Sequence, residues 1–186
     1  LTIENGTNSP VQDQEVMFYA NYSSVGFGDI GRVIRNWTID DGIYSIRFMD
    51  YYNDYSLNEL VVGSASGGDD LQIFDSNGTQ LHGIGITNIY HITVDDLDHN
   101  GYKDDIIIAA SADPGLRRYN KDLTLNASSI GRSYFYSTAT GYIDSDEYLD
   151  SAGGSLYGNT FAFDSNGTTM INQTYGSGSN PIRDLI

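Results

Sequence analysis

The chain contains no cysteine, few basic residues and no long apolar run, and each of these absences excludes a class of protein. Its 186 residues include 9 Lys and Arg against 25 Asp and Glu, so the formal charge is −16. Without cysteine there are no disulfides, thiolate metal sites or cysteine catalysis. So negative a charge argues against nucleic acid or an anionic membrane surface as partner, because both need clustered Lys and Arg. No apolar stretch approaches the roughly 18 residues that span a bilayer.

Glycine and tyrosine are abundant, and they indicate β structure. The chain has 21 Gly and 15 Tyr, and these residues, with Thr and Asn, occur in turns and strands rather than in helix interiors. The 3 His residues are scattered, and no Ser has the spacing of a nucleophile elbow. We therefore expect an all-β protein that is not an enzyme and has no catalytic residues.

A pattern of 46 residues occurs three times. Its central copy, residues 92–108, has a short apolar stretch, an acidic loop and a β-branched run. Similar patterns lie 46 positions earlier, at residues 46–63, and 46 positions later, at residues 142–154. A second pattern at residues 71–79 recurs at residues 160–168. Each unit reads as four short antiparallel strands, which is typical of a β-propeller blade; a solenoid is the structural alternative.

The two ends of the chain differ from the repeat. Residues 180–186 align with residues 88–94, so we expect them to begin a fourth unit that either continues in a longer chain or is completed by another element. Residues 1–33 do not repeat cleanly and predict a separate β segment, either immunoglobulin-like strands or a degenerate blade, before the propeller repeats of residues 34–186. An unfinished terminal strand leaves an open sheet edge, which invites strand addition from a neighbouring subunit.

The acidic loop of the central repeat has the spacing of a calcium site. Five residues that offer oxygen ligands stand at every second position: Asp96, Asp98, Asn100, Tyr102 and Asp104. Ca²⁺ takes roughly six to eight oxygens, and Tyr102 would contribute its backbone carbonyl. Gly101 allows a left-handed turn without a Cβ clash. The alternative interpretation is a solvated acidic turn.

The other two copies keep part of this pattern. The third offers four candidate ligands, with Tyr142 in place of the first carboxylate: Asp144, Asp146, Tyr148 and Asp150. The first retains Asp50, Asp54 and Asn58, while Tyr52 replaces the second acid and Tyr55 replaces the glycine. Calcium is therefore expected in the central loop and a hydrogen-bonded turn without metal in the first. For the third loop, calcium binding and a metal-free turn both stay open.

On these residues the chain resembles the FG-GAP/VCBS repeat propellers, a family that includes the head of integrin α subunits. The resemblance covers about residues 36–186, and its full motif, Asp-x-Asp-x-Asn-Gly-x-x-Asp followed by Ile-Ile-Ile, stands in the central copy. It implies a Ca²⁺-binding propeller, similar to microbial surface members of the family, that serves adhesion, ligand recognition or assembly outside the cell.

Asn-x-Ser/Thr triplets are more frequent than chance predicts. They begin at seven residues: Asn5, Asn21, Asn36, Asn77, Asn126, Asn166 and Asn172. The content of Asn, Ser and Thr would give roughly two to three such triplets, and the excess favours an exported protein that carries N-linked glycans. The alternative is that Asn-Gly-Thr at Asn77 and Asn166 only forms hairpin turns.

Together these patterns predict an extracellular or cell-surface protein with a structural or adhesive role, glycosylated and stabilised by calcium. Its expected partners are further copies of itself, added head to tail through a terminal strand at residues 1–11 or 180–186. The alternative is a monomeric, lectin-like or integrin-like propeller that binds a surface glycan or protein; clustered Tyr51, Tyr52 and Tyr55 would form a contact surface or pack between blades. A propeller-based polysaccharide lyase or hydrolase fits least, since only 9 basic residues are present.

Overall fold

The computed structural model describes residues 14–19, 33–39, 42–65 and 68–175, and their regular structure is entirely β-strand. The strands are β1 (Gln14–Tyr19), β2 (Val33–Ile39), β3 (Ile43–Met49), β4 (Glu59–Ser64), β5 (Leu71–Phe74), β6 (Gln80–Ile84), β7 (Ile89–Asp95), β8 (Asp105–Ala110), β9 (Leu116–Tyr119), β10 (Leu125–Ser128), β11 (Phe135–Gly141), β12 (Asp150–Ser155), β13 (Asn159–Phe163) and β14 (Thr169–Thr174). The predicted all-β class is confirmed. In the described ranges no helix is long and apolar enough to cross a membrane.

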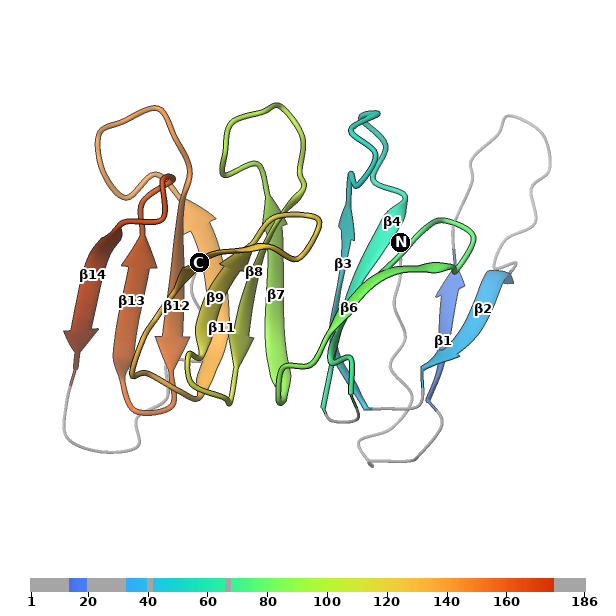
Figure 1. The fold of residues 1–186 in the computed structure, drawn as a ribbon, viewed down its shortest axis with the longest axis horizontal. Coiled ribbons are helices and arrows are strands. Elements are labelled where there is room, and N and C mark those ends of the chain that lie inside the picture. Colours follow the sequence, from blue (N-terminus) through green and yellow to red (C-terminus); the bar gives the residue numbers. More distant parts are fainter. Residues whose placement is uncertain (1–13, 20–32, 40–41, 66–67, 176–186) are drawn as a thin grey trace.

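Twelve of these strands form three four-stranded antiparallel sheets, one for each sequence repeat. The first sheet is β3–β4–β5–β6, the second β7–β8–β9–β10 and the third β11–β12–β13–β14, each ordered as in the chain. The prediction of four strands per repeat is therefore confirmed. The sheets stand side by side, with the β1–β2 pair beyond the first sheet (Figure 1). In the described part of the chain the sheets form an open row and no closed ring.

The strand order fixes an inner and an outer side of this row. The first strands of the three sheets are neighbours, since β3 contacts β7 and β7 contacts β11. The last strands, β6, β10 and β14, each pair on one side only within the described residues and form the outer edge. The acidic loops join β3 to β4, β7 to β8 and β11 to β12. All three therefore project from the same end of the strands, at the top of the sheets in Figure 1.

The central strands are buried on both faces because each sheet packs against its neighbour. All six residues of β4 and of β8 are buried, and Ile106, Ile107 and Ile108 have no exposed surface. A strand covered on both faces reads as a continuous apolar run, which is the pattern that the β-branched segments have in the sequence. The outermost strand β14 has no buried residue.

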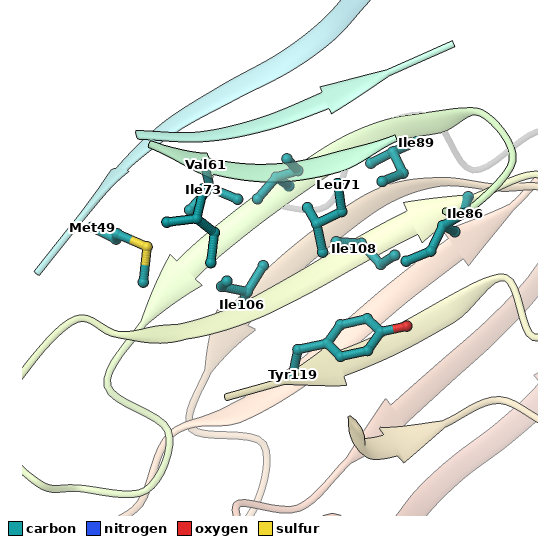
Figure 2. Close-up of a cluster of buried hydrophobic side chains, with 11 residues drawn as sticks. Met49, Val61, Leu71, Ile73, Ile86, Ile89, Ile106, Ile108 and Tyr119 are labelled. Carbon is teal, nitrogen blue, oxygen red and sulfur yellow. The ribbon is translucent and has the colours of Figure 1, made fainter. Parts of the chain in front are cut away.

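Two apolar cores hold the three sheets together. Figure 2 shows the first, where Val61 and Ile73 of the first sheet face Ile106, Ile108 and Tyr119 of the second. The second core lies between the second and third sheets and is built from Leu97, Ile107, Ala109, Leu116, Ala127, Phe135, Phe161 and Phe163. The two opposite faces of the second sheet thus pack into different cores, because side chains alternate between the faces along a strand.

At Gly63 on β4 the first two sheets approach each other closely. A Cβ built there would lie 2.7 Å from Cγ2 of Ile89 and 3.0 Å from Cδ1 of Ile92. We expect Gly63→Ala to lower the free energy of unfolding by about 1–3 kcal/mol, because overpacking forces neighbouring side chains to move. Urea unfolding measures this change. Gly141→Ala on β11 is the matched control, since its Cβ would meet nothing within 4 Å; an equal loss in both variants would contradict the explanation.

A ladder of three tyrosines also joins the sheets. Tyr44, Tyr90 and Tyr136 stand at the second position of β3, β7 and β11, separated by 46 residues each time. The ring centroids of Tyr90 and Tyr136 are 4.5 Å apart and nearly parallel, and those of Tyr44 and Tyr90 are 5.5 Å apart. Tyr90 and Tyr136 stack, and the ring of Tyr44 is tilted against Tyr90, so the ladder links the three sheets. Tyr44, at one end of the ladder, remains 54% exposed.

The N-terminal strands resemble the last two strands of a sheet. β2 pairs antiparallel with β1, and moving β2 forward by 46 residues gives residues 79–85, which include β6. The predicted domain boundary after residue 33 falls at the first residue of β2. Residues 1–11 and 180–186, the predicted sites of strand addition, lie outside the described residues.

Candidate metal centre

The acidic loop between β7 and β8 brings three carboxylates together. Oxygen atoms of Asp98, Asp104 and Asp105 lie within 4.8 Å of one another. The sequence predicted Asp98 and Asp104 as ligands but not Asp105, the first residue of β8. Asp98 is exposed, whereas Asp104 and Asp105 are buried, so the cluster has one face open to solvent.

Two other predicted ligands shape the loop. The carboxylate of Asp96 accepts hydrogen bonds from the backbone N–H of Asn100 and of Gly101, both at 2.9 Å. The Asn100 side chain donates from Nδ2 to Oδ2 of Asp98 at 3.1 Å and to Oδ1 of Asp104 at 3.2 Å. The Asn100 side chain therefore joins two carboxylates of the cluster. In the same loop, the backbone carbonyl of Tyr102 accepts a hydrogen bond from the N–H of Asp104 at 3.0 Å.

Cationic side chains contact two of the three carboxylates. Arg118 Nη2 lies 3.4 Å from Oδ1 of Asp105, and both side chains are 2% exposed. Lys121 Nζ lies 3.4 Å from Oδ2 of Asp104. Among the described residues, the carboxylate of Asp98 accepts hydrogen bonds from the backbone N–H and the side-chain amide of Asn100.

Burial has the largest effect on the pKa of the two buried acids, Asp104 and Asp105. It raises the pKa of Asp104 above its ordinary value, although hydrogen bonding from Asn100 and the charge of Lys121 act in the opposite direction. Burial likewise raises the pKa of Asp105, against the charge of Arg118 and the N–H groups of Asp98 and Leu97. A nearby cation stabilises crowded, partly desolvated carboxylates, because an opposite charge favours their ionised form.

The donor set fits a hard divalent cation. The three clustered side chains offer only carboxylate oxygen, and Asp96, Asn100 and the carbonyl of Tyr102 add further oxygen atoms within the same loop. Ca²⁺ and Mg²⁺ prefer such oxygen ligands, whereas zinc and copper sites use imidazole or thiolate. When bound, Ca²⁺ would neutralise the clustered charge and cross-link the loop; Asp98 and Asp104 are the predicted residues best placed to hold it.

The third loop follows the central loop at first and then departs from it. Asp144 accepts from the N–H of Asp146, and Asp146 accepts from the N–H of Tyr148, both at 2.9 Å, as Asp98 and Asn100 do for the residues two positions on. However, Asp150 pairs with Gly141 across the two strands, which is the place that Asp105 holds opposite Asp95.

This difference arises because the third loop is one residue shorter. Asp150 Oδ2 accepts from the N–H of Ile143 at 2.8 Å, just as Asp105 accepts from Leu97. A constant 46-residue spacing had implied that Asp150 corresponds to Asp104. In the structure it corresponds to Asp105 instead. The counterpart of Asp104 is Leu149, so the third loop lacks that carboxylate.

The first loop keeps the backbone of the central loop but has Tyr52 and Asn58 where the central loop has Asp98 and Asp104. Asp50 accepts from the N–H of Asp54 and of Tyr55 at 2.9 and 2.8 Å, which matches the role of Asp96. Asn53 and Tyr55 have φ of 59° and 64°, as His99 and Gly101 have 58° and 91°. The expected hydrogen-bonded turn is therefore present; Asn58, the third residue of this degenerate set, is exposed at the end of the loop.

Exposed tyrosines border the three loops. Tyr52, Tyr55, Tyr142 and Tyr148 are between 45% and 79% exposed. Ring contacts also join neighbouring loops: Tyr55 lies 4.7 Å from Tyr102, and His99 lies 5.1 Å from Tyr148. By contrast, Tyr51 packs against the first core and bonds through its hydroxyl to Nε2 of His82 at 2.7 Å. Of the clustered tyrosines of the first loop, Tyr51 thus packs against the core, whereas Tyr52 and Tyr55 are exposed.

The described glycosylation triplets lie along the outer edge of the sheets. Asn126 and Asn172 stand on the outermost strands β10 and β14, and Asn77 and Asn166 stand in the turns that lead into β6 and β14. All four are exposed. The turns of Asn77 and Asn166 have the predicted hairpin geometry, with φ of 81° and 84° at the following glycines. Asn36 lies on β2, and Asn5 and Asn21 lie outside the described residues.

Comparisons with known proteins find a likeness in fold. No family model matches the chain, and no curated protein matches it. Two crystal structures of computationally designed proteins, Ika8 and Ika4, resemble it with TM-scores of 0.55 and 0.54 and 16% sequence identity in each case. The match covers 75% of this chain, but 39% of Ika8 and 77% of Ika4. The chain thus spans about two fifths of Ika8, and identity this low shows a shared fold alone.

Proposed function

We propose that the chain is part of an extracellular, N-glycosylated surface protein of the FG-GAP/VCBS propeller type, with a structural or adhesive role and calcium-stabilised loops. The observation that carries this proposal is the oxygen-only cluster of Asp98, Asp104 and Asp105 at the loop end of a regular array of sheets. A cation held there would stiffen one of the loops that present the exposed tyrosines. Calcium is abundant outside cells, where weak oxygen sites can fill.

The positions of the glycosylation triplets support an exported protein. Asn77, Asn126, Asn166 and Asn172 are exposed, and none of these four lies on an inner or central strand. The arrangement of His residues favours a non-enzymatic role, because His82 contacts Tyr51, His91 contacts Arg47 and Thr138, and His99 contacts Tyr148.

A ligand-binding role is the second candidate, and the exposed tyrosines favour it. Aromatic rings that remain accessible beside acidic loops are frequent contact residues in protein recognition. In this case the partner would be a surface glycan or a protein, bound by one copy of the chain. Both functions use the same calcium-stabilised loops, so they differ in the assembly state that they require.

Sedimentation velocity on glycosylated protein separates the two functions. In the presence of calcium we expect large species, and we expect a chelator to dissociate them, because the loops that hold the shape of each subunit lose their cation. Magnesium in place of calcium is the control for a general effect of divalent charge. A monomer that only becomes less compact on chelation would contradict the assembly role and favour the ligand-binding module.

A further inference from the structure

Lys121 belongs to the turn between β9 and β10 and reaches two acidic loops at once. Its Nζ lies 3.4 Å from Oδ2 of Asp104 in the central loop and donates to Oδ1 of Asn53 in the first loop at 2.5 Å. The same ammonium lies 5.9 Å from the centre of the Tyr51 ring. One cation of the chain therefore links the carboxylate cluster of the second sheet to the loop of the first.

The cluster is already largely neutralised by the chain itself. Its three carboxylates carry three negative charges, and Arg118 and Lys121 supply two positive charges at Asp105 and Asp104. A divalent cation entering this cluster would meet the two positive side chains as well as the acids. Repulsion between like charges at such distances is substantial where solvent is partly excluded.

The two internal cations differ in their freedom to move. Arg118 is 2% exposed and also donates to the backbone carbonyl of Ser165 in the third sheet, so it is fixed. The Lys121 side chain is 34% exposed, and its flexible stem allows the ammonium to move into solvent. Asp104 can therefore exchange its partner, whereas Asp105 keeps Arg118.

We propose that Lys121 is a built-in counter-ion that occupies Asp104 in the absence of a divalent cation and leaves it when calcium binds. This inference rests on the proposed calcium function. It makes Lys121 the residue that lowers the affinity of the central loop for calcium. It also couples occupancy to the junction of the first two sheets, because the ammonium that leaves Asp104 is the one that holds Asn53.

The test compares Lys121→Met with Lys103→Met by calcium titration calorimetry in chelator-treated buffer. Lys103 is the matched control: it lies in the same acidic loop and carries the same charge, but its Nζ pairs with Asp95 at 2.9 Å and its side chain is 56% exposed. We expect Lys121→Met to lower the Kd for calcium about tenfold, and Lys103→Met to change it less than about threefold, because screening weakens exposed charges.

A second measurement separates a counter-ion from a merely structural lysine. In chelator, Lys121→Met should lower the Tm more than Lys103→Met, and saturating calcium should remove most of that difference. A lysine that only supports the turn would lower the Tm equally with and without calcium and leave the Kd unchanged, and this result would overturn the inference.

The possible outcomes also distinguish the inference from the proposed function. If the wild-type protein binds calcium and Lys121→Met binds no more tightly than Lys103→Met, the counter-ion role fails and the calcium site stands. If only Lys121→Met binds, the counter-ion role is supported in its strongest form. If no variant binds calcium, both ideas fail.

Discussion

Replacing Asp105 with Asn is expected to lower the free energy of unfolding by about 3–5 kcal/mol, even in the presence of a chelator. The substitution keeps the shape of the side chain, but it leaves the charge of Arg118 buried without its partner. Arg118 and Asp105 are both 2% exposed, and within the described part of the chain the Nε of Arg118 has no hydrogen-bond partner that could compensate. Urea unfolding in chelator measures the loss without any contribution from bound cation.

Asp95→Asn provides the matched control for this prediction. Asp95 is the residue directly opposite Asp105 across the two strands, and it carries an ion pair with the exposed Lys103. Burial acts to raise the pKa of Asp95, but hydrogen bonds from Thr140 and Lys103 outweigh it and lower the pKa. We expect about 1 kcal/mol of destabilisation there. Equal effects at the two positions would show that the buried pair is not the cause.

The double substitution Asp105→Asn with Arg118→Met extends this test. If the unpaired guanidinium is what destabilises the single variant, removing it should restore part of the lost stability. A double variant less stable than either single variant would instead indicate that the two residues act through packing alone.

Asp98→Asn is expected to abolish the stabilisation that calcium provides and to leave the chelated protein almost unchanged. Asp98 is the exposed member of the cluster, and an amide at this position can still accept the N–H of Asn100. A ligand present at about one hundred times its Kd stabilises a folded protein by about 2.7 kcal/mol. Thermal unfolding with calcium and with chelator should therefore show a large gap in Tm for the wild type and little or none for the variant.

Asp144→Asn is the control within the third loop. Asp144 holds the position of Asp98 and makes the same turn hydrogen bond, but its loop has Tyr142 and Leu149 where the central loop has Asp96 and Asp104. We expect the calcium-dependent gap in Tm to persist in this variant. If Asp98→Asn lowers the Tm equally with and without calcium, the central loop does not bind the ion.

The sequence predicted the repeated features of the fold because those features are local. A run such as Ile106–Ile108 identifies a strand covered on both faces. The acidic loop before such a run marks the connection from the preceding strand of the same sheet. Three copies in the same order then predict three similar sheets. The tyrosine ladder could have been predicted from the same spacing, since Tyr44, Tyr90 and Tyr136 are 46 residues apart.

The charges around the candidate site could not be predicted from local patterns. Arg118 and Lys121 follow Asp105 by 13 and 16 residues, and only the pairing of β8 with β9 brings them to the acidic loop. Asp105 was missed because an every-second-residue rule ends at Asp104. The shorter third loop was hidden for a related reason, because a constant spacing cannot detect the loss of one residue. The buried acids that begin β4, β8 and β12 reveal the loss: Glu59, Asp105 and Asp150.

The exposed glycosylation triplets along the outer edge have a consequence for the proposed self-assembly. Among the described residues, β6, β10 and β14 leave one side of their backbone unpaired along the outer edge, and such edges are where sheet proteins aggregate sideways. Branched sugars attached at Asn77, Asn126, Asn166 and Asn172 would form a hydrated screen over this edge. In the self-assembly proposed above, such a screen would sterically block lateral fusion along this edge.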